Sequence, residues 1–241
     1  MRGSPVLRRR ILEAQTSFAW TRLDFKGLIK SERLGPNDSF FHFSLLPAPY
    51  VGRLETADVF ILLLNPGFSP GDYFGEYERR DFRNALVQNL KQDLSDAEYP
   101  FLFLNPRFCW HPGYQWWEAK LRKILLEVAD AKHKGNYLLA LKEASQCLAS
   151  IELVPYHSRK FRDGQLADRL KSVQKARAWV NNDVVQRAAK GELVIVPTHK
   201  WNLRNRSNRV VCVKKGAALG FHITPNTEAG RLVLKRLLKK R

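Results

Sequence analysis

Short apolar runs alternate along this chain with longer segments of helical spacing. The most continuous run, Val59–Leu64, ends at Asn65-Pro66-Gly67. A run of this length that is closed by Pro and Gly predicts a buried parallel strand over residues 58–64. Other apolar runs predict further short strands. They cover residues 101–104, 151–154, 193–196 and 210–213.

Apolar residues three or four positions apart predict the helices. The clearest series is Phe82, Leu86, Leu90 and Leu94, within a helix expected over residues 79–94. Further helices are expected over residues 7–29, 114–131, 136–150, 167–191 and 226–241. We take Thr224-Pro225 as the N-cap and first residue of the last helix. Residues 35–53, 65–74 and 107–117 are expected to form loops.

This alternation of strands and helices predicts an α/β fold. We expect three layers, α/β/α, around a central, mainly parallel sheet of roughly four strands. The sequence shows no repeat, low-complexity tract or linker, so one domain is expected over residues 1–241. Residues 1–50 would form a helical and loop extension, and residues 225–241 a basic C-terminal helix.

The charge of the chain indicates its class of partner. Its 241 residues are 44% hydrophobic, which supports one substantial core. Lys and Arg number 41 against 23 acidic residues, a net charge of +18. Such a charge favours a polyanionic partner, most simply nucleic acid, with a membrane surface or an acidic protein as alternatives. We expect DNA rather than RNA, no membrane contact, and a monomer.

The cysteines and the start of the chain indicate a compartment. Cys109, Cys147 and Cys212 are far apart and form no C-x-x-C pair. Neither a disulfide framework nor a zinc knuckle is expected, and a reducing cytosol fits. The basic run Arg8–Arg10 leads into an amphipathic segment, so no signal peptide is expected. No apolar run reaches membrane-spanning length. We therefore expect a cytoplasmic protein, associated with the nucleoid if it is bacterial.

The candidate chemistry lies in three loops that follow predicted strands. The carboxyl ends of parallel strands meet at one sheet edge, where ligands of open α/β sheets bind. The loops are Asn65–Phe74, Val154–Lys160 and Pro197–Asn202. Asn65 carries one acceptor and two donors, which suit it to orienting a water or reading a base edge. A turn in which Asn65 caps its own backbone is the alternative.

The first loop resembles the uracil-DNA glycosylase superfamily, most closely its mismatch-specific and single-strand-selective branches. Their first motif is an apolar strand ending in N-P-G, here Leu62-Leu63-Leu64-Asn65-Pro66-Gly67. The segment Pro70–Phe74 and the helix with Phe82-Arg83-Asn84 are similar to the pocket loop and first helix of that family. The family's third motif, H-P-S after a strand, falls at Pro197-Thr198-His199-Lys200.

The resemblance implies a glycosylase that flips a damaged or deaminated base of the uracil type out of the helix and removes it. Asn65 would orient the attacking water, and His199 would donate a hydrogen bond to the base carbonyl as negative charge develops there. Tyr73 or Phe74 would stack on the flipped base. The substrate-binding set is completed by Pro66, Gly67, Phe68, Tyr156 and His157.

The resemblance also implies a DNA-binding loop after His199. Trp201 or Leu203 would be the wedge that fills the vacated base stack. Neighbouring cations would hold phosphates. The nucleic-acid-binding set is Arg159, Lys160, Lys200, Trp201, Leu203, Arg204, Arg206 and Arg209.

The chain departs from the family pattern in several places. The third motif reads Pro-Thr-His-Lys-Trp, without H-P-S. Asp72 lies too far past the strand to be the water-activating Asp of the Asp-dependent branch. The second strand ends in Val154-Pro155-Tyr156-His157, where many relatives have an Asn or a Pro-rich turn. Four cysteines for an iron–sulfur cluster are lacking, so we expect no cofactor.

Several alternatives remain open. His157 and His199 are equally well interpreted as surface histidines in basic loops. The aromatic segment 108–117 is better interpreted as a packed flap than as a base-stacking platform. The whole protein could be an inactive binding module of the same fold, or a basic component of a nucleoprotein assembly that uses its C-terminal helix. A metal nuclease is disfavoured. Its four candidate acids crowd one loop and helix start: Asp72, Glu76, Glu78 and Asp81.

Overall fold

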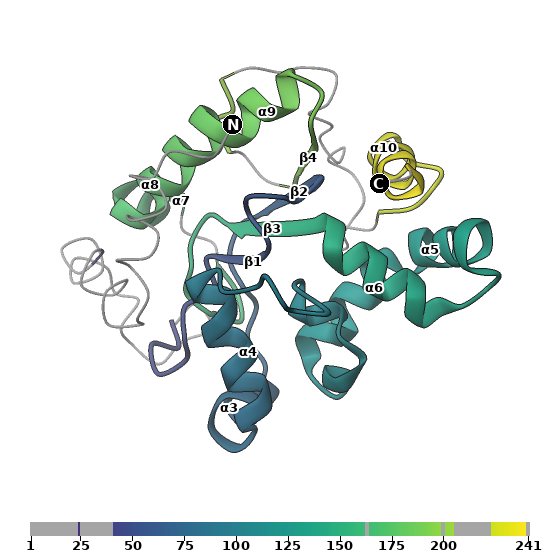
Figure 1. The fold of residues 1–241 in the computed structure, drawn as a ribbon. Helices are drawn as coiled ribbons and strands as arrows, with labels where there is room; N and C mark the ends of the chain where they lie inside the picture. Colours follow the sequence, from purple (N-terminus) through teal and green to yellow (C-terminus); the bar gives the residue numbers. More distant parts are fainter. Residues whose placement is uncertain (1–23, 25–40, 162–163, 199–200, 205–222, 240–241) are drawn as a thin grey trace.

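The structure, a computed structural model, describes residues 24, 41–161, 164–198, 201–204 and 223–239. Within these ranges a mixed α/β fold surrounds an open four-stranded sheet (Figure 1). The strands are β1 (Tyr50–Gly52), β2 (Val59–Leu63), β3 (Leu148–Glu152) and β4 (Val194–Pro197). Their order is β1-β3-β2-β4. Strand β2 pairs in parallel with β3 and β4, and β1 pairs antiparallel with β3.

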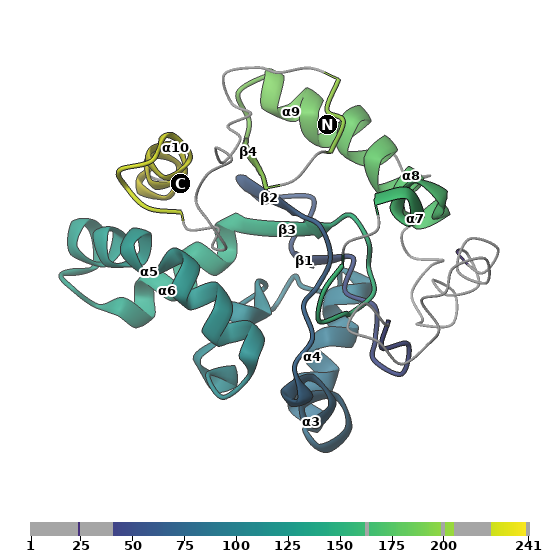
Figure 2. The same cartoon turned by 180° about the vertical axis from the view of Figure 1, so that it is seen from behind.

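The helices connect and cover these strands (Figure 2). They are α3 (Pro70–Glu78), α4 (Arg80–Lys91), α5 (Pro112–His133), α6 (Tyr137–Cys147), α7 (Gly164–Arg169), α8 (Lys171–Trp179), α9 (Val185–Ala189) and α10 (Glu228–Leu238). Two 3-10 turns, Leu102–Leu104 and Pro106–Phe108, precede α5, and a π turn, Val180–Val184, joins α8 to α9. No helix of the described ranges is both long and apolar enough to cross a membrane.

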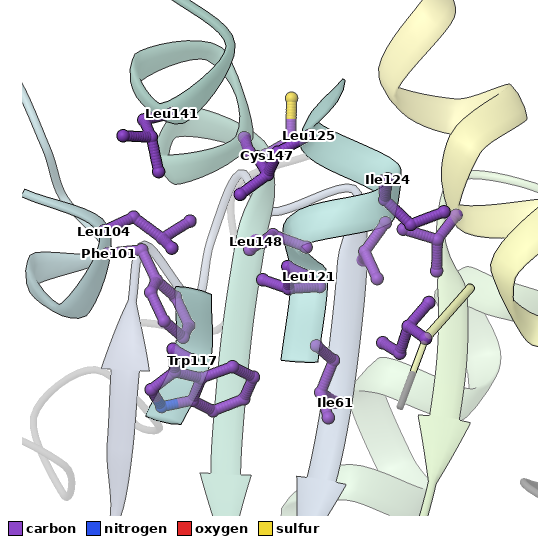
Figure 3. Packing of buried hydrophobic residues seen from close by; sticks show 14 of the residues in the cluster. Ile61, Phe101, Leu104, Trp117, Leu121, Ile124, Leu125, Leu141, Cys147 and Leu148 are labelled. Carbon is purple, nitrogen blue, oxygen red and sulfur yellow. The ribbon is translucent and has the colours of Figure 1, made fainter. Parts of the chain in front are cut away.

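Strand β2 is buried on both faces, which explains its uninterrupted apolar sequence. Val59, Ile61 and Leu63 belong to a core cluster with residues of α4, α5, α6 and α10. Phe60 and Leu62 belong to a second cluster, with residues of α7, α8 and α9. Figure 3 shows the first cluster, in which side chains of α5 pack over the sheet. Helices therefore cover both faces of β2.

Several sequence predictions are confirmed closely. The strand expected over residues 58–64 is β2, and the one expected over 193–196 is β4, displaced by one residue. The helix expected over residues 79–94 is α4, and the one expected over 114–131 lies within α5. In the two helices the buried residues recur at helical spacing over most of the length, and in the two strands every residue is buried.

Other predictions are wrong at places where local bonding overrides the apolar pattern. Residues 101–104 form a 3-10 turn rather than a strand, and the Leu104 amide donates to the Phe101 carbonyl at 2.8 Å. The strand predicted at 151–154 begins earlier, so α6 ends at Cys147. The segment 167–191 is broken into pieces around the π turn. The predicted helix 7–29, except Asp24, and the predicted strand 210–213 lie outside the described residues.

The sequence predictions missed three features of the fold. Helix α3 occupies part of the predicted loop 65–74, and a capping box between Ser69 and Asp72 begins it. Strand β1 lies in the predicted loop 35–53 and is only three residues long. Thr227, rather than Thr224, caps α10.

Gly52 in β1 provides a test of this strand arrangement. It has a φ of +93°, and an added Cβ would lie 2.3 Å from the Leu148 carbonyl oxygen. We expect Gly52→Ala to destabilise the fold by roughly 2–3 kcal/mol, measured by urea unfolding. Gly67→Ala is the matched control, because a Cβ there meets nothing within 4 Å. Equal unfolding midpoints for the two variants would contradict the arrangement.

Candidate functional site

The loops that follow β2 and β3 lie side by side, as the sequence predicts. The Val154 amide donates to the Leu64 carbonyl at 2.8 Å, and the Ser158 amide donates to the Pro66 carbonyl at 3.3 Å. The loop after β4 begins beside them, because the Thr198 amide donates to the Leu62 carbonyl at 2.9 Å. The three predicted loops therefore start from the same edge of the sheet.

Asn65 is half-buried between the first two loops. Its Nδ2 lies 2.8 Å from the Pro66 carbonyl oxygen, 3.0 Å from Ser158 Oγ and 3.3 Å from the Tyr156 carbonyl oxygen. Three surrounding acceptors fix which end of the amide is nitrogen. The Oδ1 atom accepts no hydrogen bond from the described residues and is not among their enclosed, unpartnered atoms. It is free to accept a hydrogen bond from water.

Three rings form a group beside this loop. The rings of His42 and Phe68 are stacked, with centroids 3.5 Å apart and planes 10° apart. Tyr73 meets Phe68 edge to face at 5.6 Å. The Tyr73 hydroxyl also lies 3.1 Å from His42 Nδ1 and 2.9 Å from Ser44 Oγ. The predicted ligands Phe68 and Tyr73 are thus together, with His42 as an additional member that no sequence motif indicated.

Two buried carboxyls fix the position of α3 and the segment before β1. Asp72 Oδ2 accepts from the Ser69 amide at 2.7 Å. Glu76 accepts from the Leu46 amide at 2.9 and 3.2 Å. Burial raises the pKa of Asp72, and it raises the pKa of Glu76 to about 7. Both acids therefore hold the backbone in place.

Two histidines face this acidic region. His111 Nδ1 accepts from the Gly113 amide at 2.9 Å, so the neutral ring carries its proton on Nε2. That Nε2 lies 3.3 Å from Asp72 Oδ1, without hydrogen-bond geometry. Burial lowers the pKa of His111 to about 4. His157 Nδ1 lies 2.8 Å from the Gly67 carbonyl, and burial lowers the pKa of His157 against the opposing effect of Asp72. No group of three or more metal-ligating side chains occurs within the described ranges.

Three predicted ligands lie elsewhere. Trp201 is buried in the second core cluster, 1% exposed, and its Nε1 donates to the Leu63 carbonyl at 3.1 Å, so it is not placed as a wedge. Tyr156 is buried, and its hydroxyl donates to Asp24 at 2.8 Å, so it is not placed to hold a base. Phe74 is 49% exposed and packs edge to face on Trp110 at 5.5 Å. For Trp201 and Tyr156, burial of a large ring outweighed the loop position on which the prediction relied.

The remaining predicted residues are partly described. Arg159, Lys160 and Arg204 are exposed, and Leu203 is half-buried against the second core cluster. The Arg204 amide donates to Asn181 Oδ1 at 2.8 Å, which fixes this part of the loop. The other predicted residues lie outside the described ranges. They are His199, Lys200, Arg206 and Arg209.

Glu152, the last residue of β3, is a potential functional residue that the sequence reasoning missed. It is 8% exposed, and its Oε2 is enclosed without a hydrogen-bond partner. It pairs in register with Leu63, two residues before Asn65. Burial raises its pKa well above the usual range. The available signal was a single charged residue in the otherwise uncharged segment 147–154.

Comparisons with protein-family models, with curated proteins and with solved structures give no significant match.

Glu76 gives a pH-dependent test of how α3 is held. Because its pKa rises from 4.5 to about 7 on folding, the folded state binds more protons between these values. Its contribution to stability is therefore full at low pH and is lost as the pH rises to about 7. We expect the free energy of unfolding of wild type to fall by roughly 2–3 kcal/mol more than that of Glu76→Gln between pH 5 and 8. Parallel urea-unfolding profiles for the two proteins would contradict this.

Proposed function

We propose that this protein is a DNA glycosylase that removes a damaged or deaminated base by water attack on the N-glycosidic bond. The observation that carries the proposal is the amide of Asn65, whose nitrogen is surrounded by three acceptors while its oxygen is free. It stands just beyond the central parallel strand, where ligands of such sheets bind.

The held amide has a direct chemical use. Because Nδ2 is anchored to two loops, the amide cannot rotate freely, and Oδ1 keeps one direction. A water that donates to Oδ1 would have its lone pair directed at the anomeric carbon, and such positioning lowers the entropic part of a barrier. The resemblance to uracil-DNA glycosylases assigns stabilisation of the departing base to His199. The same proposal needs no metal and no cofactor.

The charge of the chain supports a nucleic-acid substrate. The net charge is +18, and exposed Arg159 and Lys160 directly follow Ser158, a partner of the Asn65 amide. Cations beside the loops would hold the phosphates that flank a flipped nucleotide. DNA rather than RNA, a monomer and a cytoplasmic location belong to this proposal.

The fold proposed with this function is one domain of three layers, α/β/α. Two core clusters support it, because one contains residues of α4, α5, α6 and α10 and the other contains residues of α7, α8 and α9. In such a domain both layers of helices leave the carboxyl edge of the sheet to the loops, which is where the base would enter.

A second candidate is a nucleic-acid-binding module of the same fold without catalysis. The stacked rings of His42 and Phe68 favour it, because they already occupy one aromatic face that a base would need. A glycosylase must part these rings or use the edge of Tyr73, whereas a binding module need not.

The catalytic role of Asn65 can be tested by cleavage. End-labelled single- and double-stranded oligonucleotides containing uracil, hypoxanthine, xanthine or a G·T mismatch are incubated with the protein and then treated with alkali. We expect Asn65→Ala to lower the rate of strand breaks by about 10²–10⁴-fold with unchanged DNA affinity. Ser158→Ala should give a smaller loss, because two acceptors of the amide remain. Asn182→Ala, an exposed asparagine on the π turn, is the control.

The outcomes separate the two candidates. Equal activity of Asn65→Ala and wild type would show that Asn65 does not orient the water. No cleavage by wild type, together with salt-dependent retention of the oligonucleotides, would favour the binding module.

Substitution of Arg204 tests whether the loop after β4 binds DNA, for the glycosylase and for the binding module alike. Arg204 is exposed in the segment that the buried Trp201 anchors to the end of β2. We expect Arg204→Ala to weaken binding and to lower the slope of log affinity against log salt by about one unit. Lys123→Ala removes the same charge from an exposed position on α5 and should leave the slope nearly unchanged. Identical slopes for the two variants would place the DNA elsewhere.

A further inference from the structure

We propose that Glu152 is a general acid that protonates the departing base, and that the base is therefore a deaminated purine. This inference rests on the proposed glycosylase function and narrows its substrate class. It concerns a side chain to which the resemblance assigns no role.

The position of Glu152 brings it close to Asn65. Glu152 pairs in register with Leu63 on the neighbouring strand, and Asn65 follows two residues later. With the usual strand spacing and rise, the two Cα atoms are about 8 Å apart. Leu148, four residues before Glu152 and on the same side of β3, faces the first core cluster, as does Leu63. A nucleotide held at Asn65 is thus within reach of a side chain at this strand end.

The surroundings of Glu152 decide its protonation state. In the described part of the chain its side chain has no ion pair and no hydrogen bond, and its Oε2 is enclosed. A carboxylate buried without a partner is costly, whereas the neutral acid is tolerated. Burial therefore raises the pKa of Glu152 well above its usual range and favours the neutral acid. A protonated, unpartnered carboxyl can donate its proton but is poorly suited to accept one.

The other buried acids of this region differ from Glu152. Asp72 and Glu76 accept hydrogen bonds from the backbone amides of Ser69 and Leu46, and they are engaged in holding α3. The Glu152 carboxyl binds no described backbone group, so it performs no comparable structural task. Its second oxygen, Oε1, is not among the enclosed, unpartnered atoms.

The reaction balances with these groups. The Glu152 carboxyl gives its proton to N7 of the purine, and the bond between C1′ and N9 breaks with its electron pair moving to the base. The water oriented by Asn65 adds to C1′ and releases a proton, which restores the Glu152 carboxyl. A donor of this kind needs a ring nitrogen with a free lone pair. Purines present N7 for this purpose, whereas a uracil nucleoside presents only carbonyl oxygens.

The test uses the full chain and oligonucleotides that contain hypoxanthine or 7-deazahypoxanthine, which lacks the N7 lone pair. Single-turnover rates are measured from pH 5 to 10 for wild type, Glu152→Gln and the matched control Glu76→Gln, with urea unfolding of each protein. We expect Glu152→Gln to be folded and about 10²–10⁴-fold slower on hypoxanthine. The wild-type rate should fall as the pH rises through the pKa of the acid, and the variant should lack this decrease.

The 7-deaza substrate tests the proton transfer without any variant. Wild type should cleave the 7-deaza substrate as slowly as Glu152→Gln cleaves the hypoxanthine substrate. On the 7-deaza substrate, Glu152→Gln should be no slower than wild type. Equal rates of wild type and Glu152→Gln, or equal wild-type rates on the two substrates, would overturn the acid role while leaving the glycosylase proposal intact. Wild type that cleaves uracil but neither purine would overturn the substrate class, and wild type that cleaves no base would overturn both proposals.

Discussion

The parallel pairing of β2 with β3 is the interaction on which the rest of the structure depends. It continues past the strands, where loop amides at Val154 and Ser158 donate to carbonyls of the β2 loop. The side-chain amide of Asn65 adds two hydrogen bonds between the same two loops, to the Tyr156 carbonyl oxygen and to Ser158 Oγ. Because β2 is buried on both faces, its register cannot slip without moving apolar residues out of both cores. The position of Asn65 is therefore set by the packing of the whole sheet.

Burial acts differently on the three acids near this edge. Asp72 and Glu76 obtain backbone amides as partners, and they join α3 to the loops around it. Glu152 obtains no such partner. All three carboxyls are removed from water. Asp72 and Glu76 thereby position backbone segments, whereas Glu152 is the proposed proton donor. This difference in hydrogen bonding is what separates a structural acid from a chemical one in this fold.

The strength of the hydrophobic pattern decided how much of this could be predicted. Strand β2 and helix α4 follow from residues such as Ile61 and Leu86, whose spacing repeats over the whole element. The turn at residues 101–104 looks like a strand because four apolar residues in a row fit either structure. In the site, the motif around Asn65 was found, but Trp201 and Tyr156 were taken for ligands although they are core residues. His42 and Glu152 were missed because only the tertiary fold brings them to the loops.

The most direct test of the central claim is the release of free base, measured by mass spectrometry under single-turnover conditions with equal occupancy of wild type and Asn65→Ala on a DNA that contains deaminated bases. We expect one free base per abasic site from wild type and almost none from the variant, at equal DNA binding. Wild type that binds this DNA without releasing any base, or a variant that releases base as fast as wild type, would contradict it.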